Sequence, residues 1–255
     1  MDGRRKHGAY EDEDALEPTP MQARFYNIIE TGLSPERLGA YGSDNPGGCI
    51  VLARYLLNAA LAESLYSPLQ LCEVALRNSI HAELSRLWGR EDWYDDPRFV
   101  LLSWAASEVQ NAKRKILKTK PAIQPGGVVA ELSFGFWTSL FEPHYENNTP
   151  FLPGGIKRVF PFLPKSLHHR KNRKADLEKI RLLRNRIFHH ERILHWKDLD
   201  AKHALILDVL SWINPELRQM ALVFDRYSEI RTAGLTPWIE RIRAQWPAHP
   251  TSASS

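Results

Sequence analysis

The chain has 255 residues, of which 43% are hydrophobic and 25% are charged. These ordinary values exclude a chain that is disordered throughout. The two cysteines, Cys49 and Cys72, are too few for a disulfide framework and lack the spacing of a metal site, so we expect buried free thiols.

Positive charge is concentrated in one stretch. The net charge is +4, but residues 157–192 contain twelve Lys or Arg against three Asp or Glu, which gives +9 there and −5 elsewhere. A basic block in an otherwise acidic protein fits binding to a polyanion, most often nucleic acid. A solvated helix face followed by a loop explains the same charge equally well.

Both ends of the chain are polar. Residues 1–20, with the acidic cluster 11–14, and residues 246–255 are expected to be disordered tails. Residues 21–245 are expected to form a single helical domain. The first residues lack the apolar run of a signal peptide, and charges interrupt the most apolar stretch, around 49–71, so we expect a cytoplasmic protein.

Apolar residues recur at helical spacing through the first half of the domain. They predict one helix from about Ile50 to Leu65, and a second to Trp88 with Pro68 in its first turn. A third helix is expected from Phe99 to about Leu117.

Glycine and proline punctuate the middle of the chain. After the break at 125–127, residues 128–141 are expected to form a short helix whose aromatic segment, 134–137, belongs to the core. Residues 143–164 contain five prolines and predict a loop region with at most one short helix.

The basic residues 165–174 are expected to form a loop that leads into a helix over residues 175–188. Further helices are predicted from Leu199 to about Ser211 and from Glu216 to Arg231, separated by Asn214-Pro215. No stretch alternates in the manner of a strand. The sequence therefore predicts an all-α fold.

The helix ending near residue 188 places several chemistry-bearing side chains within two turns. Arg184 and His189 lie about 140° apart around a helix. A guanidinium binds phosphate with two donors and stabilises charge on a phosphorane. An imidazole transfers protons near neutral pH. This pair suits RNA cleavage by the 2′-hydroxyl, which requires no metal, and the sequence predicts neither a metal site nor a cofactor.

Structural roles explain the same residues. Arg184 could bridge a neighbouring carboxylate, and His189 could cap the C-terminal end of its helix, where positive charge is favoured.

Three segments resemble one family. Arg184-Asn185-x-x-x-His189 resembles the signature of HEPN-domain ribonucleases, and residues 183–192 are similar to the C-terminal motif of Abi-like (abortive infection) proteins. Residues 73–80 are similar to that family's E-x-x-LRN-x-I helix, and residues 132–137 to its S-F-G-F-W segment. The segments follow the family's order and span about residues 50–215.

The resemblance implies a HEPN-type helical bundle with extra helices. It also implies a homodimer that restricts phage by cutting RNA, with a protein or small RNA as possible antitoxin. Arg184 and His189 match the catalytic positions, and Asn185 matches the polar position after the arginine. The spacing favours His189 over its neighbour His190 as acid or base. A non-catalytic RNA-binding or regulatory HEPN module is the alternative, and a helical interaction protein is a third.

Other residues are assigned to support or RNA contact. Glu73, Arg77 and Asn78 either lie on a helix surface or position Arg184, and we favour positioning for them, with His81 as a mere neighbour. The predicted contacts to RNA phosphates are Arg186 and Arg192, together with a basic loop containing Lys165, Arg170, Lys171, Arg173 and Lys174. That loop is either a solvated linker or a funnel for RNA, and its place directly before the motif helix slightly favours the funnel.

Overall fold

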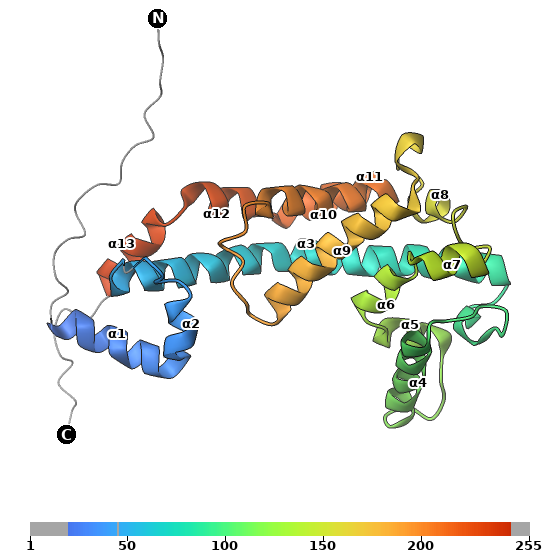
Figure 1. Ribbon diagram of the computed structural model, residues 1–255, viewed down its shortest axis with the longest axis horizontal. Coiled ribbons are helices and arrows are strands. Elements are labelled where there is room, and N and C mark those ends of the chain that lie inside the picture. The colour runs from blue at the N-terminus through green and yellow to red at the C-terminus, as the bar shows by residue number, and fades with distance from the viewer. Residues whose placement is uncertain (1–19, 45, 246–255) are drawn as a thin grey trace, which may run out of the picture. The chain divides into compact units, whose positions relative to one another are not determined.

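The computed structural model describes residues 20–44 and 46–245 (Figure 1). These residues form thirteen α-helices and two short 3-10 helices, and they contain no strand. The predicted all-α fold is confirmed. The tails predicted at 1–19 and 246–255 lie outside the described residues, whereas Pro20 begins the first helix.

The described residues form two compact units where the sequence suggested one domain. The smaller unit comprises the described residues up to Ala59 together with those from Thr232 onward, and the larger comprises Ala60–Arg231. Helix α3 (Gly48–Trp88) contributes to both. All residues predicted to act chemically belong to the larger unit.

The smaller unit contains α1, α2, α13 and the first part of α3. Its core consists of Leu38, Tyr41, Val51 and Leu52, against which partly buried side chains of α1 and α13 pack. Ser34 caps α2, because its hydroxyl accepts a hydrogen bond from the backbone N–H of Arg37 at 3.3 Å. The bounds are α1 (Pro20–Leu33), α2 (Pro35–Gly39) and α13 (Thr236–Gln245).

Helix α3 is continuous over 41 residues and contains Pro68 in its interior. The prediction of a new helix at Pro68 is therefore wrong. Proline removes one backbone hydrogen bond from a helix, but Leu65 and Leu69 on either side are almost completely buried. Their burial holds the helix together across the missing bond.

The same helix is long and apolar enough to cross a membrane. Half of the residues in its most apolar window are buried within the protein. Buried core helices share this composition, so the property does not distinguish the two environments.

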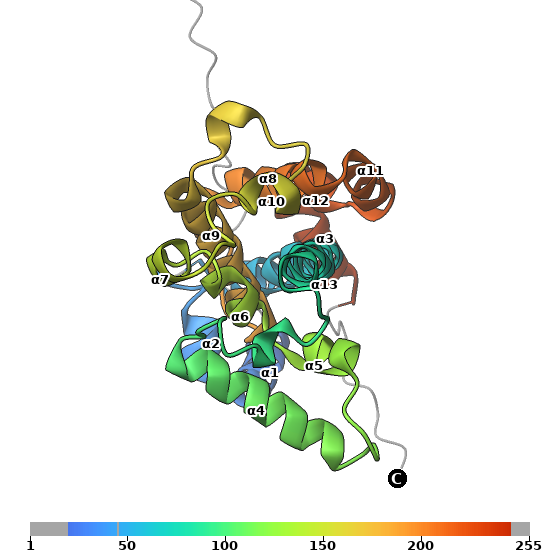
Figure 2. The same cartoon turned by 90° about the vertical axis from the view of Figure 1, so that its right-hand side faces the viewer.

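The larger unit surrounds the rest of α3 with shorter helices. Figure 1 shows α9 running obliquely in front of α3, and Figure 2 shows α9 and α10 next to each other, in agreement with their direct packing. Helix α10 also packs on α11, and α6 packs on α9. The helices are α4 (Ser103–Leu117), α5 (Pro125–Glu131), α6 (Phe134–Ser139), α7 (Pro143–Asn148), α8 (Ile156–Val159), α9 (Arg170–Phe188), α10 (Leu199–Ile213), α11 (Pro215–Phe224) and α12 (Tyr227–Ala233), the last of which extends past Arg231; the 3-10 helices are η1 (Trp93–Asp95) and η2 (Lys165–Leu167).

Aromatic side chains form the centre of this unit. Trp93 lies edge-on against Phe99 and Trp137, with ring centroids 5.3 and 6.1 Å apart. Phe99 stacks on Tyr145 at 5.7 Å. Phe136 and Trp137 are fully buried, which confirms that the 134–137 segment belongs to the core.

Several predicted boundaries differ from the structure. The helix predicted over 128–141 is two helices, α5 and α6, because the Ser133 hydroxyl caps α6 by accepting from the N–H of Phe136. The helix expected from Phe99 begins at Ser103. The region 143–164 holds two short helices rather than at most one. Helix α9 begins at Arg170, five residues earlier than predicted.

Candidate functional site

Helix α9 ends in a Schellman motif that contains both histidines. His189 ends the helix, and His190 follows with a φ of 56°. The N–H of His190 donates to the carbonyl of Ile187 at 3.0 Å, and the N–H of Glu191 donates to the carbonyl of Arg186 at 2.8 Å. Glycine usually occupies the left-handed position of this motif. His190 therefore has a backbone role that His189 does not share.

Arg186 stabilises the same helix end. Its side chain forms an ion pair with Glu191, so the two residues joined by the backbone hydrogen bond are also joined by their side chains. An apolar contact is usual at this place in a Schellman motif. The predicted RNA contact of Arg186 would have to compete with this pair.

Arg184 is oriented from two sides. Its Nε donates to Glu73 Oε2 at 3.2 Å, and its guanidinium lies 4.0 Å from the centre of the Phe188 ring. The Phe188 ring in turn stacks on Tyr66 at 5.0 Å. The Arg184 side chain remains 27% exposed, and its two terminal nitrogens have no hydrogen-bond partner among the described residues. A fixed guanidinium with free donors is able to bind a phosphate.

His189 is exposed and lies less than two turns beyond Arg184. Its backbone N–H donates to the carbonyl of Asn185 at 2.9 Å. Within residues 20–44 and 46–245, no side chain forms a hydrogen bond or ion pair with its imidazole. The ring is thus accessible for proton transfer, but no hydrogen bond from the described part of the chain fixes its orientation.

The supporting residues on α3 divide into two groups. Glu73 contacts Arg184, as the positioning interpretation requires. Among the described residues, neither Arg77 nor Asn78 forms a hydrogen bond or ion pair with Arg184; the Nε of Arg77 is buried without a hydrogen-bond partner, and Asn78 is exposed. Asn78 lies five residues beyond Glu73, about 140° around the helix.

The segment predicted as a basic loop is helical from Arg170 onward, so the prediction of a loop is wrong for residues 170–174, and three of its five basic residues form ion pairs. Arg170 begins α9, and its Nε lies 2.5 Å from Glu146 while Nη1 donates to the carbonyl of Phe141 at 3.0 Å. Lys174 pairs with Glu142 at 2.5 Å. These helical residues anchor the start of α9 to the region around α7.

Arg173 is buried, contrary to the exposure that an RNA contact requires. Its side chain is 5% exposed and pairs with Asp176 at 2.8 Å. Its guanidinium lies 4.3 Å from the centre of the Trp212 ring on α10. Burial lowers its pKa, an effect that the nearby Asp176 opposes. Only Lys165 and Lys171 of the predicted set are exposed and without a side-chain partner among the described residues.

The segment after α9 carries positive charge. Partial burial, and then the charges of Arg192 and Arg186, lower the pKa of His195. This exposed imidazole was not singled out in the sequence, because it stands outside the Arg-x-x-x-x-His pattern. The contributions of Arg192 and Arg186 to this lowered pKa indicate positive charge beside the Arg184–His190 motif.

Two further histidines have structural contacts that the sequence did not reveal. The indole N–H of Trp93 donates to Nδ1 of His81 at 3.0 Å, and burial lowers the pKa of that imidazole. His203 is buried with its Nε2 2.8 Å from Asp225. Their partners lie 12 and 22 residues away in the sequence, so no local sequence pattern predicts either contact.

No group of three or more His, Cys, Asp or Glu side chains arranged for a metal ion occurs among the residues that the structure describes. Cys72 is fully buried, and burial together with the charge of Glu73 raises the pKa of its thiol to about 12. Cys49 is only partly buried, so the expectation of a buried thiol holds for Cys72 alone.

No family model, curated protein or solved structure matches this chain significantly.

Proposed function

We propose that the protein is a metal-independent endoribonuclease of the Abi-like HEPN type, acting in the cytoplasm as a toxin in phage defence. One observation carries the proposal: Glu73 and Phe188 fix Arg184 with its terminal nitrogens free, and the accessible His189 stands at the end of the same helix. This combination offers phosphate binding and proton transfer in one place.

In the proposed reaction, the ribose 2′-oxygen attacks the adjacent phosphorus, and the bond from phosphorus to the 5′-oxygen breaks. The 2′-hydroxyl proton passes to a base, and an acid protonates the departing 5′-oxygen. The products are a 2′,3′-cyclic phosphate and a 5′-hydroxyl. Arg184 stabilises the negative charge that develops on the phosphorane, and His189 serves as the acid or the base.

The reaction needs two proton transfers, and a homodimer would supply a second copy of His189 for the other. Helix α11 offers an apolar surface for such association, with Met220 55% and Val223 86% exposed. A separate antitoxin, protein or small RNA, would restrain the active dimer in the cell.

A non-catalytic RNA-binding module is the alternative function. It is favoured by the absence of any described neighbour that orients the His189 ring, since acid–base catalysis requires a positioned group. It is also favoured by the use of Arg184 in an ion pair with Glu73, which is the structural role first considered for this arginine.

Cleavage of RNA in the presence of EDTA separates the two functions. Wild type is expected to produce fragments with 2′,3′-cyclic phosphate ends, and Arg184→Ala and His189→Ala are expected to lose at least a hundredfold in rate. Both variants should still bind RNA, because removing one side chain leaves most of the positive surface intact.

The exposed residue Lys120 provides a control, since Lys120→Ala removes one positive charge from the connection between α4 and α5, outside the motif. Undiminished cleavage by His189→Ala would reject His189 as acid or base. RNA binding without cleavage by wild type would establish the alternative, and binding that is absent or independent of salt would reject both RNA-directed functions.

A further inference from the structure

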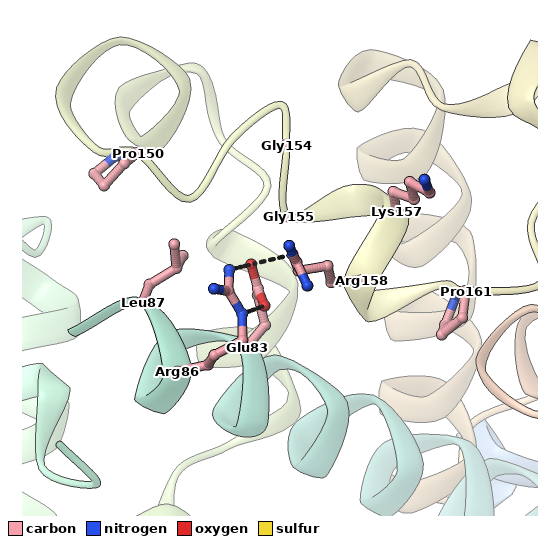
Figure 3. A pocket seen from close by; sticks show the side chains of 9 residues that line it. All are labelled: Glu83, Arg86, Leu87, Pro150, Gly154, Gly155, Lys157, Arg158 and Pro161. Carbon is pink, nitrogen blue, oxygen red and sulfur yellow. Dashed lines mark hydrogen bonds and ion pairs between the residues drawn. The ribbon is translucent and has the colours of Figure 1, made fainter. Parts of the chain in front are cut away.

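A second basic site lies where α3 and α8 meet. The cavity has a volume of about 610 Å³, and its wall combines the end of α3 with the Gly154-Gly155 turn and α8 (Figure 3). It is lined by Glu83, Arg86, Leu87, Pro150, Gly154, Gly155, Lys157, Arg158 and Pro161. None of these residues belongs to the motif at the end of α9.

The charges in this cavity are organised by one buried carboxylate. The Glu83 side chain is only 4% exposed, and its two oxygens accept from Nε and Nη2 of Arg86, each at 2.8 Å. Arg158 approaches the same carboxylate from α8, with its Nε 3.7 Å away. Figure 3 shows both guanidinium groups converging on Glu83. The buried acid thus holds two arginines of different helices at one cavity.

The lining remains positively charged after this pairing. Three cations, Arg86, Lys157 and Arg158, face one carboxylate, which leaves a charge of +2. Lys157 is exposed and has no side-chain partner among the described residues. A cavity lined by two guanidinium groups and one ammonium group favours a ligand that carries a phosphate.

Gly155 brings the backbone close enough to form the cavity wall. A Cβ at this position would lie 2.4 Å from the carbonyl oxygen of Phe151, so any other residue would displace the turn. A Cβ on Gly154 would meet nothing within 4 Å. The tight turn directly precedes Lys157 and Arg158 and fixes where α8 presents them.

The size and the remaining lining indicate more than a simple anion. A volume of about 610 Å³ is typical of sites for small organic ligands. Leu87 and Pro150 supply an apolar wall on one side of the charged cluster, and Pro161 lies on the other side (Figure 3). We propose that this cavity binds a nucleotide, with its phosphate on Lys157 and Arg158 and its sugar or base on the apolar wall.

The nucleotide could be free or part of an RNA strand, and both present the same phosphate chemistry. Glu83 lies ten residues beyond Glu73 on α3, which is about 15 Å along the helix. The cavity is therefore separate from the Arg184 site. If the nucleotide belongs to RNA, the inference rests on the proposed function; if it is free, the inference stands alone.

Calorimetric titration of the full-length protein tests the site with four probes. These are inorganic phosphate, adenosine, adenosine 5′-monophosphate and a 2′-O-methyl RNA oligonucleotide, which cannot be cut through its 2′-oxygen. Lys157→Glu is the test variant and Lys120→Glu is the matched control, because both reverse one exposed lysine. Circular dichroism verifies that each variant is folded, and Arg158→Gln tests the second cation without placing a new acid beside Glu83.

We expect Lys157→Glu to weaken binding about tenfold and Lys120→Glu to leave it unchanged, the size expected for one charge-assisted contact to phosphate. If Lys157→Glu weakens binding of the monophosphate in this way, and adenosine binds more weakly than the monophosphate, the ligand is a free nucleotide. If it holds for the oligonucleotide alone, the ligand is RNA. Equal binding of every probe by the two variants, including no binding by either, overturns the proposal. Because no probe is cleaved, this result is independent of the RNase test.

Discussion

At the level of single residues, the adjacent His189 and His190 at the end of α9 differ in backbone conformation. His190 adopts the left-handed conformation, whereas the backbone of His189 has a φ of −92°. A left-handed conformation costs a β-branched residue more than glycine, because the Cβ approaches the following carbonyl oxygen.

We predict that His190→Gly is more stable than His190→Val by about 1–2 kcal/mol. Both changes remove the imidazole, so the comparison isolates the backbone. Urea unfolding measures the difference. If His189 performs the chemistry, His190→Gly also retains RNA cleavage that His189→Ala loses; a loss of cleavage in His190→Gly with normal stability would reassign the acid or base to His190.

The contact between Glu73 and Arg184 predicts energetic coupling. Their side chains are 20% and 27% exposed, so solvent screens the pair and we expect a coupling free energy of about 0.5–1 kcal/mol in a double-mutant cycle of Glu73→Ala and Arg184→Ala. Unfolding by urea gives the four stabilities. The matched cycle uses Asn78→Ala, because Asn78 is an exposed residue of the same helix with no described hydrogen bond or ion pair to Arg184. It is expected to give no coupling, and equal coupling in both cycles would contradict the contact.

The hydrogen bond from Trp93 to His81 predicts a pH dependence of stability. A protonated His81 cannot accept this bond, and burial lowers its pKa in the folded protein. The unfolded chain takes up the proton near pH 6.5, as unperturbed histidine does, while the folded protein takes it up at lower pH. The stabilising contribution is therefore complete above about pH 6.5 and is lost as the pH falls through the folded pKa.

We expect the free energy of unfolding to fall between pH 7.5 and about pH 5, and to fall less in His81→Gln. Urea titrations at several pH values measure this difference. His189→Ala serves as the control because its imidazole is exposed, and it is expected to follow wild type. An identical pH dependence in His81→Gln and wild type would exclude His81 as the source.

At the level of helices, the start of α9 illustrates how burial overrides composition. The sequence presents five Lys or Arg side chains between residues 165 and 174. This run resembles a solvated loop, yet Arg173 lies over Trp212 and Arg170 lies against Glu146. Their partners belong to helices distant in sequence, which a local charge pattern cannot indicate.

Arg173→Ala is therefore predicted to destabilise the protein by about 2–4 kcal/mol, because it removes a buried ion pair and a cation–π contact together. Lys171→Ala, an exposed change in the same turn, is expected to alter stability by less than about 0.5 kcal/mol. Thermal and urea unfolding measure both. Similar effects of the two substitutions would indicate that Arg173 is not buried in solution.

Helix positions were predicted better than helix boundaries. The periodic apolar residues correctly located α3, α4, α9 and α10, since each must bury one face. Pro68 was misjudged because burial on both sides holds a long helix together despite one missing hydrogen bond. The division between α5 and α6 was missed because it depends on two features at once. Ser133 caps the start of α6, and the aromatic residues that follow it are buried in the core. Neither feature alone marks a helix boundary in the sequence.

At the level of the whole molecule, the sequence predicts the local motifs but not the contacts between residues that are far apart in the chain. The resemblance placed Arg184 and His189 in one short motif and Glu73 in another, but Glu73 and Arg184 are separated by 111 positions, so the sequence gives no signal of their contact. The cavity beside Glu83 was missed entirely, although the Gly154-Gly155 pair before Lys157-Arg158 marks one of its walls. Periodicity reports which face of a helix is buried, not which helix covers it.

Self-association is the remaining prediction for the whole chain. Helix α11 exposes Met220, Leu222, Val223 and Phe224, with Val223 at 86%, although the opposite residue Ala221 is fully buried. Adjacent apolar side chains on one exposed helix favour burial against another protein surface. For a proposed dimeric nuclease, the simplest such surface is α11 of a second copy.

Wild type is expected to sediment as a dimer and Val223→Asp as a monomer, because a carboxylate buried without a partner strongly disfavours association. Leu117→Asp on α4 is the control, since Leu117 is also exposed, at 55%, and it should remain dimeric. Sedimentation velocity over a range of concentrations measures the masses. If the dimer assembles the RNase centre, Val223→Asp also loses RNA cleavage; a monomeric wild type that cleaves RNA would show that one Arg184–His189 set is sufficient.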